Sequence, residues 1–305
     1  MDYTTLQKMY PELIILENEP LSKYTYTKTG GPAQLLFQPK STNEIIDIVK
    51  WAKDNNYPLN VIGNGSNILI RDGGINGVTI ILTMFKNIEV KRNKIVAQSG
   101  ASLIKVSNIA LKKKLSGIEF ACGIPGTVGG AVYMNAGAYG GEVKNIIQDV
   151  TLLMQNGNVI KLSNEEMEFG YRKSKLMNDH NIVLEVTFLL TPGSYLRSKI
   201  KIWKFSYLRA TKQPLNYPSC GSVFKDSPNH YTGRLIKEMG LQGKTIGGAQ
   251  ISKKHPNFIV NVDNATTTDY IELISYIKRV VYQRYGYHFE VEPVIIGEEV
   301  NTDWV

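Results

Sequence analysis

The chain has 305 residues, of which 43% are hydrophobic and 20% charged, an ordinary composition for a globular protein with room for two or three domains. No run of about 18 apolar residues occurs, and the first twenty residues lack the basic-then-apolar pattern of a signal peptide, so we expect neither a membrane span nor a leader. Two cysteines, Cys122 and Cys220, are too few for a disulfide framework or a zinc site. This cysteine usage favours a reducing, cytoplasmic location.

The net charge of +8 suits an anionic partner, and a nucleotide would satisfy it as well as a nucleic acid. The densest basic run, Lys112–Lys114, ends a predicted helix and complements the helix dipole. No basic stripe interleaved with aromatic residues occurs, so we expect no nucleic-acid partner. The four histidines are scattered without the spacing of a metal motif, and we expect no metal site.

In chain order, "STNEIIDIVKWAKDNN" predicts an amphipathic helix opened by the capping pair Ser41 and Glu44. The short apolar run "YPLNVI" then predicts a strand that leads into a glycine-rich loop. "SLIKVSNIALKKK" predicts a second helix, and "VTLLMQNGNVIKL" predicts a β-hairpin that turns at Asn156 and Gly157.

A break at 191–194, "TPGS", precedes a lysine- and aromatic-rich helix predicted over 195–212. The last predicted helix, "TTDYIELISYIKRVVYQRYG", carries an apolar stripe of Tyr270, Leu273, Ile274, Ile277 and Val281 and stops at Gly286. The pattern is typical of a mixed α+β protein. We place domain boundaries so that residues 1–85 and 86–195 form two subdomains and 196–305 forms a C-terminal domain.

Two glycine-rich loops dominate the sequence: "GNGSN", 63–67, and "GIPGTVGGAVYMNAGAYGG", 123–141. Bare backbone of this kind can turn several N–H groups inward and bind a pyrophosphate, although a pair of tight turns explains the glycines as well. The Rossmann fingerprint fails because Ile68 takes the place of its last glycine, and "EMGLQGKT" fails as a P-loop because Glu238 replaces the first glycine. If a dinucleotide binds here, another fold holds it.

Seven stretches in order along the chain carry a specific resemblance: "TKTGGPA", "IGNGSN", "GIEFACGIPGTVGGAVYMNAGAYGGE", "GYRKS", "KQPLNYPSCGSVFKD", "GLQGKTIGGAQIS" and "VEPVIIGE". Together they resemble the UDP-N-acetylenolpyruvoylglucosamine reductase family, in its compact form. The resemblance implies a two-subdomain FAD-binding portion of the vanillyl-alcohol-oxidase type, followed by a C-terminal α+β substrate domain.

The resemblance also implies a reaction. NADPH reduces a non-covalently bound FAD, whose N5 then passes a hydride to C3 of the enolpyruvyl group of UDP-N-acetylglucosamine enolpyruvate, while C2 receives a proton. The product, UDP-N-acetylmuramate, serves peptidoglycan synthesis and so cell shape and division. We expect a monomeric cytoplasmic enzyme.

Three residues fall at the family's catalytic positions. By resemblance, Ser222 gives the proton to C2, Arg172 holds the substrate carboxylate, and Glu292 assists from the C-terminal domain. Glu290 is a fallback for Glu292, because Pro293 follows where the family usually has valine. On propensity alone, each would be a turn serine, a surface cation or an exposed carboxylate.

The binding residues that the resemblance implies belong to two sets. Those expected to hold FAD are Gly63, Asn64, Gly65, Ser66, Asn67, Gly123, Gly126, Thr127, Gly129 and Gly130. Those expected to contact the UDP diphosphate are Arg209 and Lys212, three apart on one helix, and Lys254 in "SKKHPNF". The role of Asp226, where relatives often carry asparagine, stays open.

Two alternatives belong to other classes. An FAD-dependent oxidase of the same superfamily would often tether its flavin through a histidine, but no histidine precedes residue 180. A nucleotide-sugar binding module without flavin would be colourless. A serine hydrolase has less support, because no G-x-S-x-G motif occurs.

Overall fold

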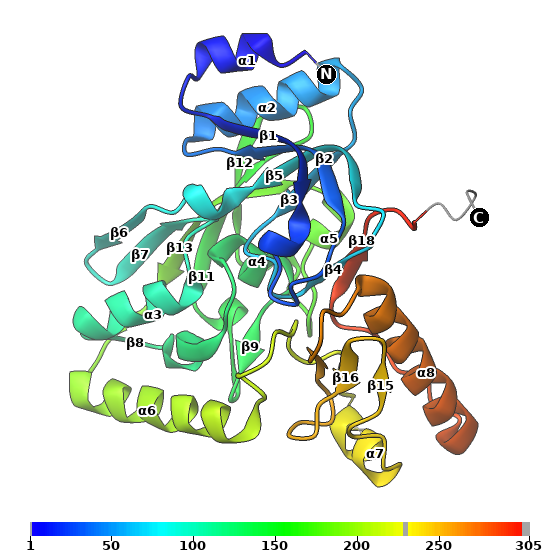
Figure 1. The fold of residues 1–305 in the computed structure, drawn as a ribbon. Helices are drawn as coiled ribbons and strands as arrows, with labels where there is room; N and C mark the ends of the chain where they lie inside the picture. The colour runs from blue at the N-terminus through cyan, green and yellow to red at the C-terminus, as the bar shows by residue number, and fades with distance from the viewer. Residues whose placement is uncertain (1, 228–230, 301–305) are drawn as a thin grey trace. The chain divides into compact units, whose positions relative to one another are not determined.

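The computed structural model describes residues 2–227 and 231–300, which form two compact units (Figure 1). Unit 1 comprises residues 1–16, 35–64 and 77–209, and unit 2 comprises residues 17–34, 65–76 and 210–305. Both units contain helices and strands, which confirms the mixed α+β class. The domain boundaries that we placed at 85 and 195 remain predictions.

The larger sheet of unit 1 has five strands in the order β12-β11-β13-β7-β6, all antiparallel. Its strands are β6 (Ile88–Lys91), β7 (Lys94–Gln98), β11 (Ile147–Leu153), β12 (Val159–Ser163) and β13 (Ile182–Leu189). The predicted hairpin joins β11 to β12, and Gly157 in its turn has a φ of 88°, a conformation that glycine adopts without strain. One face of this sheet is buried with α3 (Leu103–Lys112) in a single apolar cluster.

A second sheet has the order β1-β2-β5-β3, with β3 and β5 parallel. Its strands are β1 (Ile14–Pro20), β2 (Pro32–Gln38), β3 (Leu59–Ile62) and β5 (Ile75–Ile81). Helix α2 (Thr42–Asp54) buries Ile45, Ile48, Val49 and Ala52, the face expected from the apolar spacing. Ser41 caps it as predicted, but the Glu44 carboxylate accepts the N–H of Lys40 rather than that of Ser41.

The second glycine-rich segment differs from the open loop that we expected. It contains a helix, α4 (Val128–Tyr133), whose N-cap is Thr127: the Thr127 hydroxyl accepts the N–H of Gly130 at 3.3 Å. Two short paired strands follow, β9 (Gly137–Ala138) and β10 (Gly141–Glu142). The glycines therefore belong to a folded element, and several of their N–H groups already have partners within the protein.

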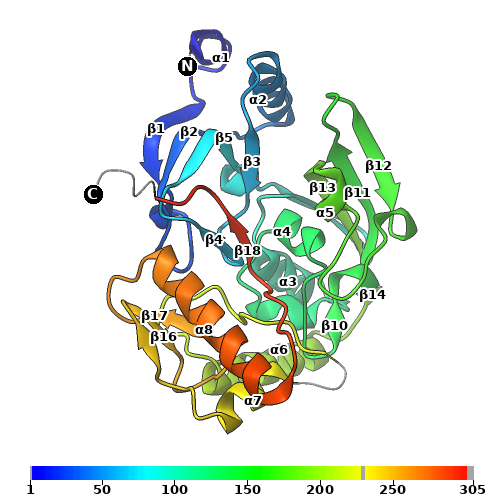
Figure 2. The same ribbon diagram turned by 90° about the vertical axis from the view of Figure 1, so that its right-hand side faces the viewer.

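In unit 2, a three-stranded antiparallel sheet of β15 (Thr245–Ile246), β16 (Ala249–Ile251) and β17 (Ile259–Asn261) packs with α8 (Thr267–Tyr285), as Figure 2 shows. Helix α8 buries Tyr270, Leu273, Ile274, Ile277 and Val281, the stripe expected from the sequence, and ends at Gly286 with a φ of 65°. A separate parallel pair joins β4 (Ile68–Ile70) to β18 (Val294–Ile296).

The remaining elements are short, except for α6. The helices are α1 (Thr4–Met9), α5 (Leu176–Asp179), α6 (Tyr195–Lys212) and α7 (Thr232–Glu238); the paired strands are β8 (Leu115–Ser116) and β14 (Thr191–Pro192); and 3₁₀ turns lie at Leu21–Lys23, Leu82–Met84, Glu119–Gly123, Val143–Asn145 and Glu165–Met167. Across the described residues, every helix is too short or too polar to cross a bilayer.

The packing of α8 gives a first prediction. Ile277→Ala removes a side chain that is fully buried in unit 2, so we expect a loss of about 2–5 kcal/mol in the free energy of unfolding. Lys278→Ala, one residue along on the exposed side, should change it by about 0.5 kcal/mol or less. Urea unfolding followed by circular dichroism measures both, and equal losses would contradict the assigned burial.

Candidate active site

In unit 2, Ser222 lies in an extended segment that is held from both sides. On one side, Ser222 forms a bridge with Phe258, and the N–H of Val223 donates to the carbonyl of Asn257 at 2.9 Å. On the other, the carbonyl of Val223 accepts the N–H of Glu292 at 2.8 Å. The structure thus brings together Ser222 and Glu292, two of the three predicted catalytic residues, although 70 positions separate them in the sequence.

Glu292 and its fallback Glu290 have different surroundings. The Glu290 carboxylate forms an ion pair with Lys225 and its side chain is largely exposed. Glu292 is half-buried, and its carbonyl accepts a hydrogen bond from the Asn67 side chain at 3.4 Å. Burial raises the pKa of the Cys220 thiol to about 12, and the negative charge of Glu292 adds to this effect, so the carboxylate lies near the segment that carries Ser222.

A buried amide that no sequence motif singles out fixes this segment. Asn257 accepts the N–H of Phe224 at 3.0 Å through its Oδ1 and donates to the Phe224 carbonyl at 2.8 Å through its Nδ2. The same Nδ2 donates to the Thr232 hydroxyl at 2.9 Å, which in turn donates to Asp226. Asp226, whose role the sequence left open, therefore anchors the first residue of α7.

The predicted substrate residues Lys212 and Lys254 lie in unit 2, where His255 joins them. The Lys254 ammonium donates to the carbonyl of Ala210 at 2.7 Å. Burial lowers the pKa of His255; the charge of Asp226 opposes this shift and that of Lys212 adds to it. Within residues 2–227 and 231–300, the buried Nδ1 of His255 has no hydrogen-bond partner. We had not selected this histidine.

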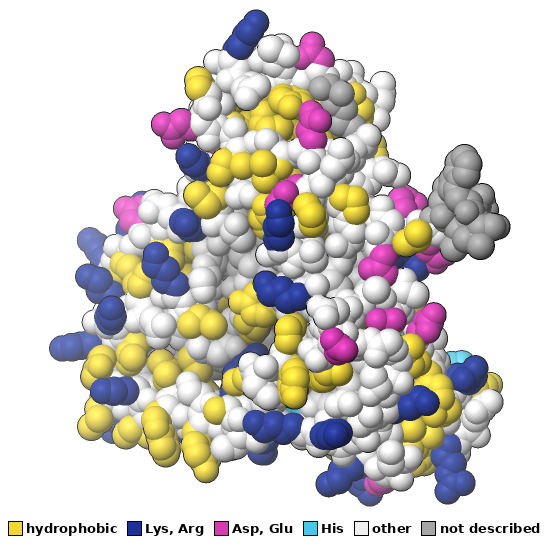
Figure 3. Space-filling view, viewed as in Figure 1, with side chains coloured by type: hydrophobic (Ala, Val, Ile, Leu, Met, Phe, Trp, Pro, Cys, Tyr) yellow, Lys and Arg dark blue, Asp and Glu magenta, His cyan; other side chains and the backbone are white. Residues whose placement is uncertain are grey.

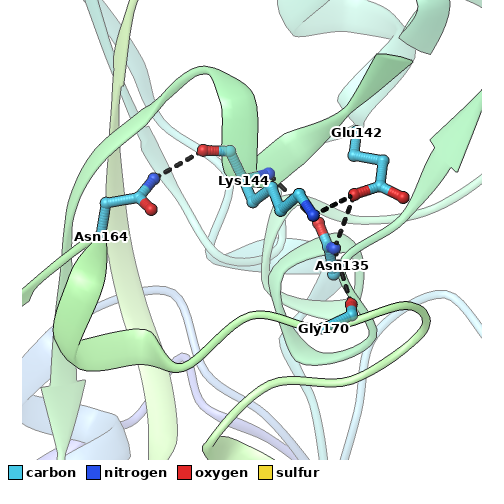
Figure 4. Close-up of polar contacts among 5 residues, drawn as sticks. All are labelled: Asn135, Glu142, Lys144, Asn164 and Gly170. Atoms are coloured by element: carbon cyan, nitrogen blue, oxygen red, sulfur yellow. Dashed lines mark hydrogen bonds and ion pairs between the residues drawn. The ribbon is translucent and has the colours of Figure 1, made fainter. Parts of the chain in front are cut away.

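In unit 1, Arg172 lies at the tip of a tightly held loop. The carbonyl of Gly170 accepts a hydrogen bond from Asn135 Nδ2 at 2.8 Å, and Ser174 donates to the Tyr133 carbonyl at 2.6 Å. Asn135 is fully buried and also donates to Glu142 at 3.1 Å, as Figure 4 shows. The loop is therefore fixed on the second glycine-rich segment.

The side chain of Arg172 is oriented by its neighbours. One guanidinium nitrogen donates to the Gly137 carbonyl at 3.3 Å, and the guanidinium carbon lies 4.9 Å from the centre of the Tyr171 ring. Burial acts to raise the pKa of Glu142, but hydrogen bonds from Lys144 and Asn135 and the charges of Lys144 and Arg172 outweigh it and lower that pKa. Arg172 therefore has an ionised carboxylate in its electrostatic surroundings.

The two glycine-rich segments meet in unit 1. The side chain of Asn64 donates to the Pro125 carbonyl at 2.9 Å, and a Cβ at Gly63 would overlap the Thr127 hydroxyl. A Cβ at Gly123 would lie 2.8 Å from Cδ of Arg209, so this predicted diphosphate ligand lies against the second segment. Glycine is needed here for close packing within the protein.

Not every predicted FAD-binding amide is available. The N–H of Gly129 donates to the Ser99 carbonyl at 2.8 Å, and the N–H of Gly130 to Thr127. The hydroxyl of Ser99 is buried and has no hydrogen-bond partner among the described residues. In unit 2, Gly65 takes a φ of 65° and leads into Ser66 and Asn67.

Comparisons with known proteins identify the two parts of the chain. Residues 213–296 match the C-terminal domain of UDP-N-acetylenolpyruvoylglucosamine reductase, and residues 33–163 match an FAD-binding domain. The UDP-N-acetylenolpyruvoylglucosamine reductase of Lactiplantibacillus plantarum is 49% identical over 291 residues, covering 95% of this chain and 96% of the relative. The chain belongs to the UDP-N-acetylenolpyruvoylglucosamine reductase family.

Two further members of this reductase family show how far the likeness extends. The Staphylococcus aureus reductase is 48% identical over 296 residues, covering 97% of this chain and 96% of the relative. The crystal structure of the reductase from Thermus caldophilus matches with a TM-score of 0.80 at 32% identity, covering 93% of this chain and 98% of that one. The likeness therefore spans the fold, from the FAD-binding part to the C-terminal domain.

The network around Ser222 gives a prediction on local order. Asn257→Ala leaves the N–H and C=O of Phe224 without their partners, at a cost of about 1–3 kcal/mol for each buried group. We expect the peptide covering 219–226 to lose hydrogen-exchange protection, measured by mass spectrometry. Asn216→Ala, at an exposed position nearby, should leave this protection unchanged. Unchanged exchange in both variants would contradict the anchoring role of Asn257.

The two thiols give a second prediction. Because burial raises the pKa of both Cys220 and Cys122, neither thiol ionises readily near neutral pH. We expect Cys220, which is fully buried, to react with a thiol reagent only after unfolding, and Cys122 to react slowly. Labelling the native protein, with Cys122→Ser and Cys220→Ser as controls, tests this. Rapid native labelling of Cys220 would show that its segment opens.

Proposed function

We propose that this chain catalyses the NADPH-dependent reduction of UDP-N-acetylglucosamine enolpyruvate to UDP-N-acetylmuramate, with FAD as its cofactor. The observation that carries the proposal is the placement of Ser222 beside Glu292, on a segment held by backbone bonds from both sides, in a chain of this reductase family. A serine so restrained can present its hydroxyl in one orientation.

The residues of unit 1 suit a coenzyme with a diphosphate. The Asn64 side chain joins the two glycine-rich segments through the Pro125 carbonyl, so the backbone at Gly63 and Gly123 lies in one place in unit 1. When bound, FAD supplies the ring that accepts a hydride from NADPH and delivers it to the substrate. Gly65, Ser66 and Asn67 continue the first loop. We assign Gly126, Thr127, Gly129 and Gly130 a shaping role, because the amides of all three glycines are already engaged.

Ser222 is the proposed proton donor. Its O–H bond breaks as a C–H bond forms at C2 of the enolpyruvyl group, and the serine oxygen then recovers a proton. A free serine hydroxyl is a weak acid, so neighbouring groups must assist its ionisation. We assign the return of the proton to Glu292, whose carboxylate takes a proton from water and passes it to the serine oxygen, and whose backbone is bonded to the residue after Ser222.

The cations have two proposed tasks. Arg172, held at the tip of its loop, binds the substrate carboxylate through a forked pair of N–H donors and offsets the charge that develops as the substrate is reduced. Arg209, Lys212 and Lys254 bind the UDP diphosphate.

We also propose that the enzyme acts as a monomer in the cytoplasm, within peptidoglycan synthesis. The support is indirect: both cysteines are free thiols, as a reducing compartment would keep them.

An anaerobic titration tests the function. NADPH should bleach the bound flavin, and addition of the enolpyruvyl nucleotide should restore its absorbance with formation of UDP-N-acetylmuramate. Bleaching without recovery would leave an NADPH-oxidising flavoprotein with another substrate. A protein that binds no flavin would overturn the proposal.

The role of Ser222 has its own test. Ser222→Ala should leave flavin reduction by NADPH nearly intact, because only the second half-reaction needs the proton, and should slow flavin reoxidation by the enolpyruvyl nucleotide by about 10²-fold or more. Stopped-flow absorbance separates the two steps. Ser219→Ala, in the same motif, is the matched control and should behave as wild type. Equal damage to both half-reactions would show that the serine is misassigned.

A further inference from the structure

Helix α6 carries an apolar stripe on its outer face. Leu196, Ile200, Trp203 and Tyr207 are exposed by 64%, 57%, 68% and 57%. Their spacing of four, three and four residues places them within about 60° of one another around the helix. The rings of Trp203 and Tyr207 stack with centroids 5.7 Å apart. The stripe is therefore a continuous ridge of large side chains in contact with water.

The opposite face of α6 already accounts for the packing of the helix on unit 1. Ser198 is buried and donates to Glu119 at 2.6 Å, the carbonyl of Ile202 lies 3.9 Å from the Cys122 sulfur, and Phe205 stacks on Tyr139 with centroids 4.6 Å apart. This inner face has the same four-three spacing as the outer one. The outer stripe is thus not needed to hold α6 in place.

The polar residues beside the stripe are cations. The segment 195–209 contains Arg197, Lys199, Lys201, Lys204 and Arg209 and no acidic residue. Lys199 lies about 40° from the stripe on one side and Lys204 about 40° from it on the other. Figure 3 shows the result at lower left, where hydrophobic side chains gather over α6 with basic ones around them.

From this arrangement, we propose that the outer face of α6 binds the surface of an anionic lipid bilayer. A bilayer offers a plane of negative headgroups with apolar chains directly beneath, so the stripe enters the headgroup boundary while the flanking lysines stay at the phosphates. Exposed tryptophan and tyrosine favour the same boundary. The helix lies on the membrane and does not cross it.

A second copy of the chain suits this face less well. Self-association through α6 would bring together two segments that each carry five cations and no carboxylate. A protein partner would need an apolar groove bordered by acidic residues on both sides. The proposal departs from our sequence-based expectation of no membrane partner, which rested on the absence of a spanning helix. It is independent of the proposed reaction.

Vesicle flotation of the full-length, flavin-loaded protein tests the proposal. We expect the protein to float with vesicles of phosphatidylcholine and phosphatidylglycerol at low salt, and about tenfold less of it to float with phosphatidylcholine alone or at high salt. The double variant Ile200→Ser/Trp203→Ser should bind about tenfold or more weakly. Met9→Ser/Val159→Ser, which removes two exposed apolar side chains elsewhere in unit 1, should bind as wild type.

A spectroscopic measurement covers the case in which the serine variant folds poorly. Anionic vesicles should shift the tryptophan emission of wild type to the blue, and Trp203→Phe should lose this shift while still floating. Three results would overturn the proposal: no flotation of wild type with anionic vesicles, equal flotation with neutral ones, or a wild-type dimer that Ile200→Ser/Trp203→Ser converts to monomer. The last would assign the stripe to a second copy.

Discussion

One buried side-chain amide holds the segment that carries Ser222. Asn257 bonds both the N–H and the C=O of Phe224, and its own carbonyl takes the N–H of Val223. Residues 222–225 run between two other pieces of chain without belonging to a regular sheet. The side-chain amide replaces the backbone hydrogen bonds that a neighbouring strand would provide. The proposed role of Ser222 depends on these hydrogen bonds, because a mobile segment would not hold its hydroxyl in one orientation toward the substrate.

Unit 1 uses the same device for Arg172. Asn135 is fully buried, takes the N–H of Lys144, and donates to both Glu142 and the carbonyl of Gly170. A buried amide pays its desolvation cost only when its donors and acceptors are all engaged, and such a group then specifies one local structure. In each unit, therefore, an asparagine that touches no proposed reacting atom fixes the loop that carries a proposed catalytic side chain.

The regular elements could be predicted from the sequence because each has a local signal. Helices α2 and α8 show apolar periodicity and capping residues, and the β11–β12 hairpin shows its Asn-Gly turn. Helix α4 could not be predicted, because glycine runs disfavour helices; its first turn is held by the Thr127 cap and by hydrogen bonds to the carbonyls of Ser99 and Ala101, residues distant in the sequence. Asn135 and Asn257 escaped notice because a single buried amide leaves no periodic trace.

The meeting of Ser222 with Glu292 was predictable only through the resemblance, since no local pattern relates residues so far apart. For the glycines, a local sequence pattern was visible but its cause was not. Sequence alone left open whether a ligand or the protein itself approaches them, and at Gly63 and Gly123 the atoms that lie close belong to the protein. Composition predicts a bare backbone, whereas only the tertiary structure shows what fills the space beside it.

Arg172 has a φ of 52°, a left-handed conformation that glycine adopts without steric strain and other residues rarely adopt. Holding a non-glycine residue there costs about 1–2 kcal/mol. A search for more stable sequences would therefore favour glycine at this position and erase the guanidinium. Such optimisation, applied without regard to chemistry, would yield a more stable protein without the side chain that we propose binds the substrate carboxylate.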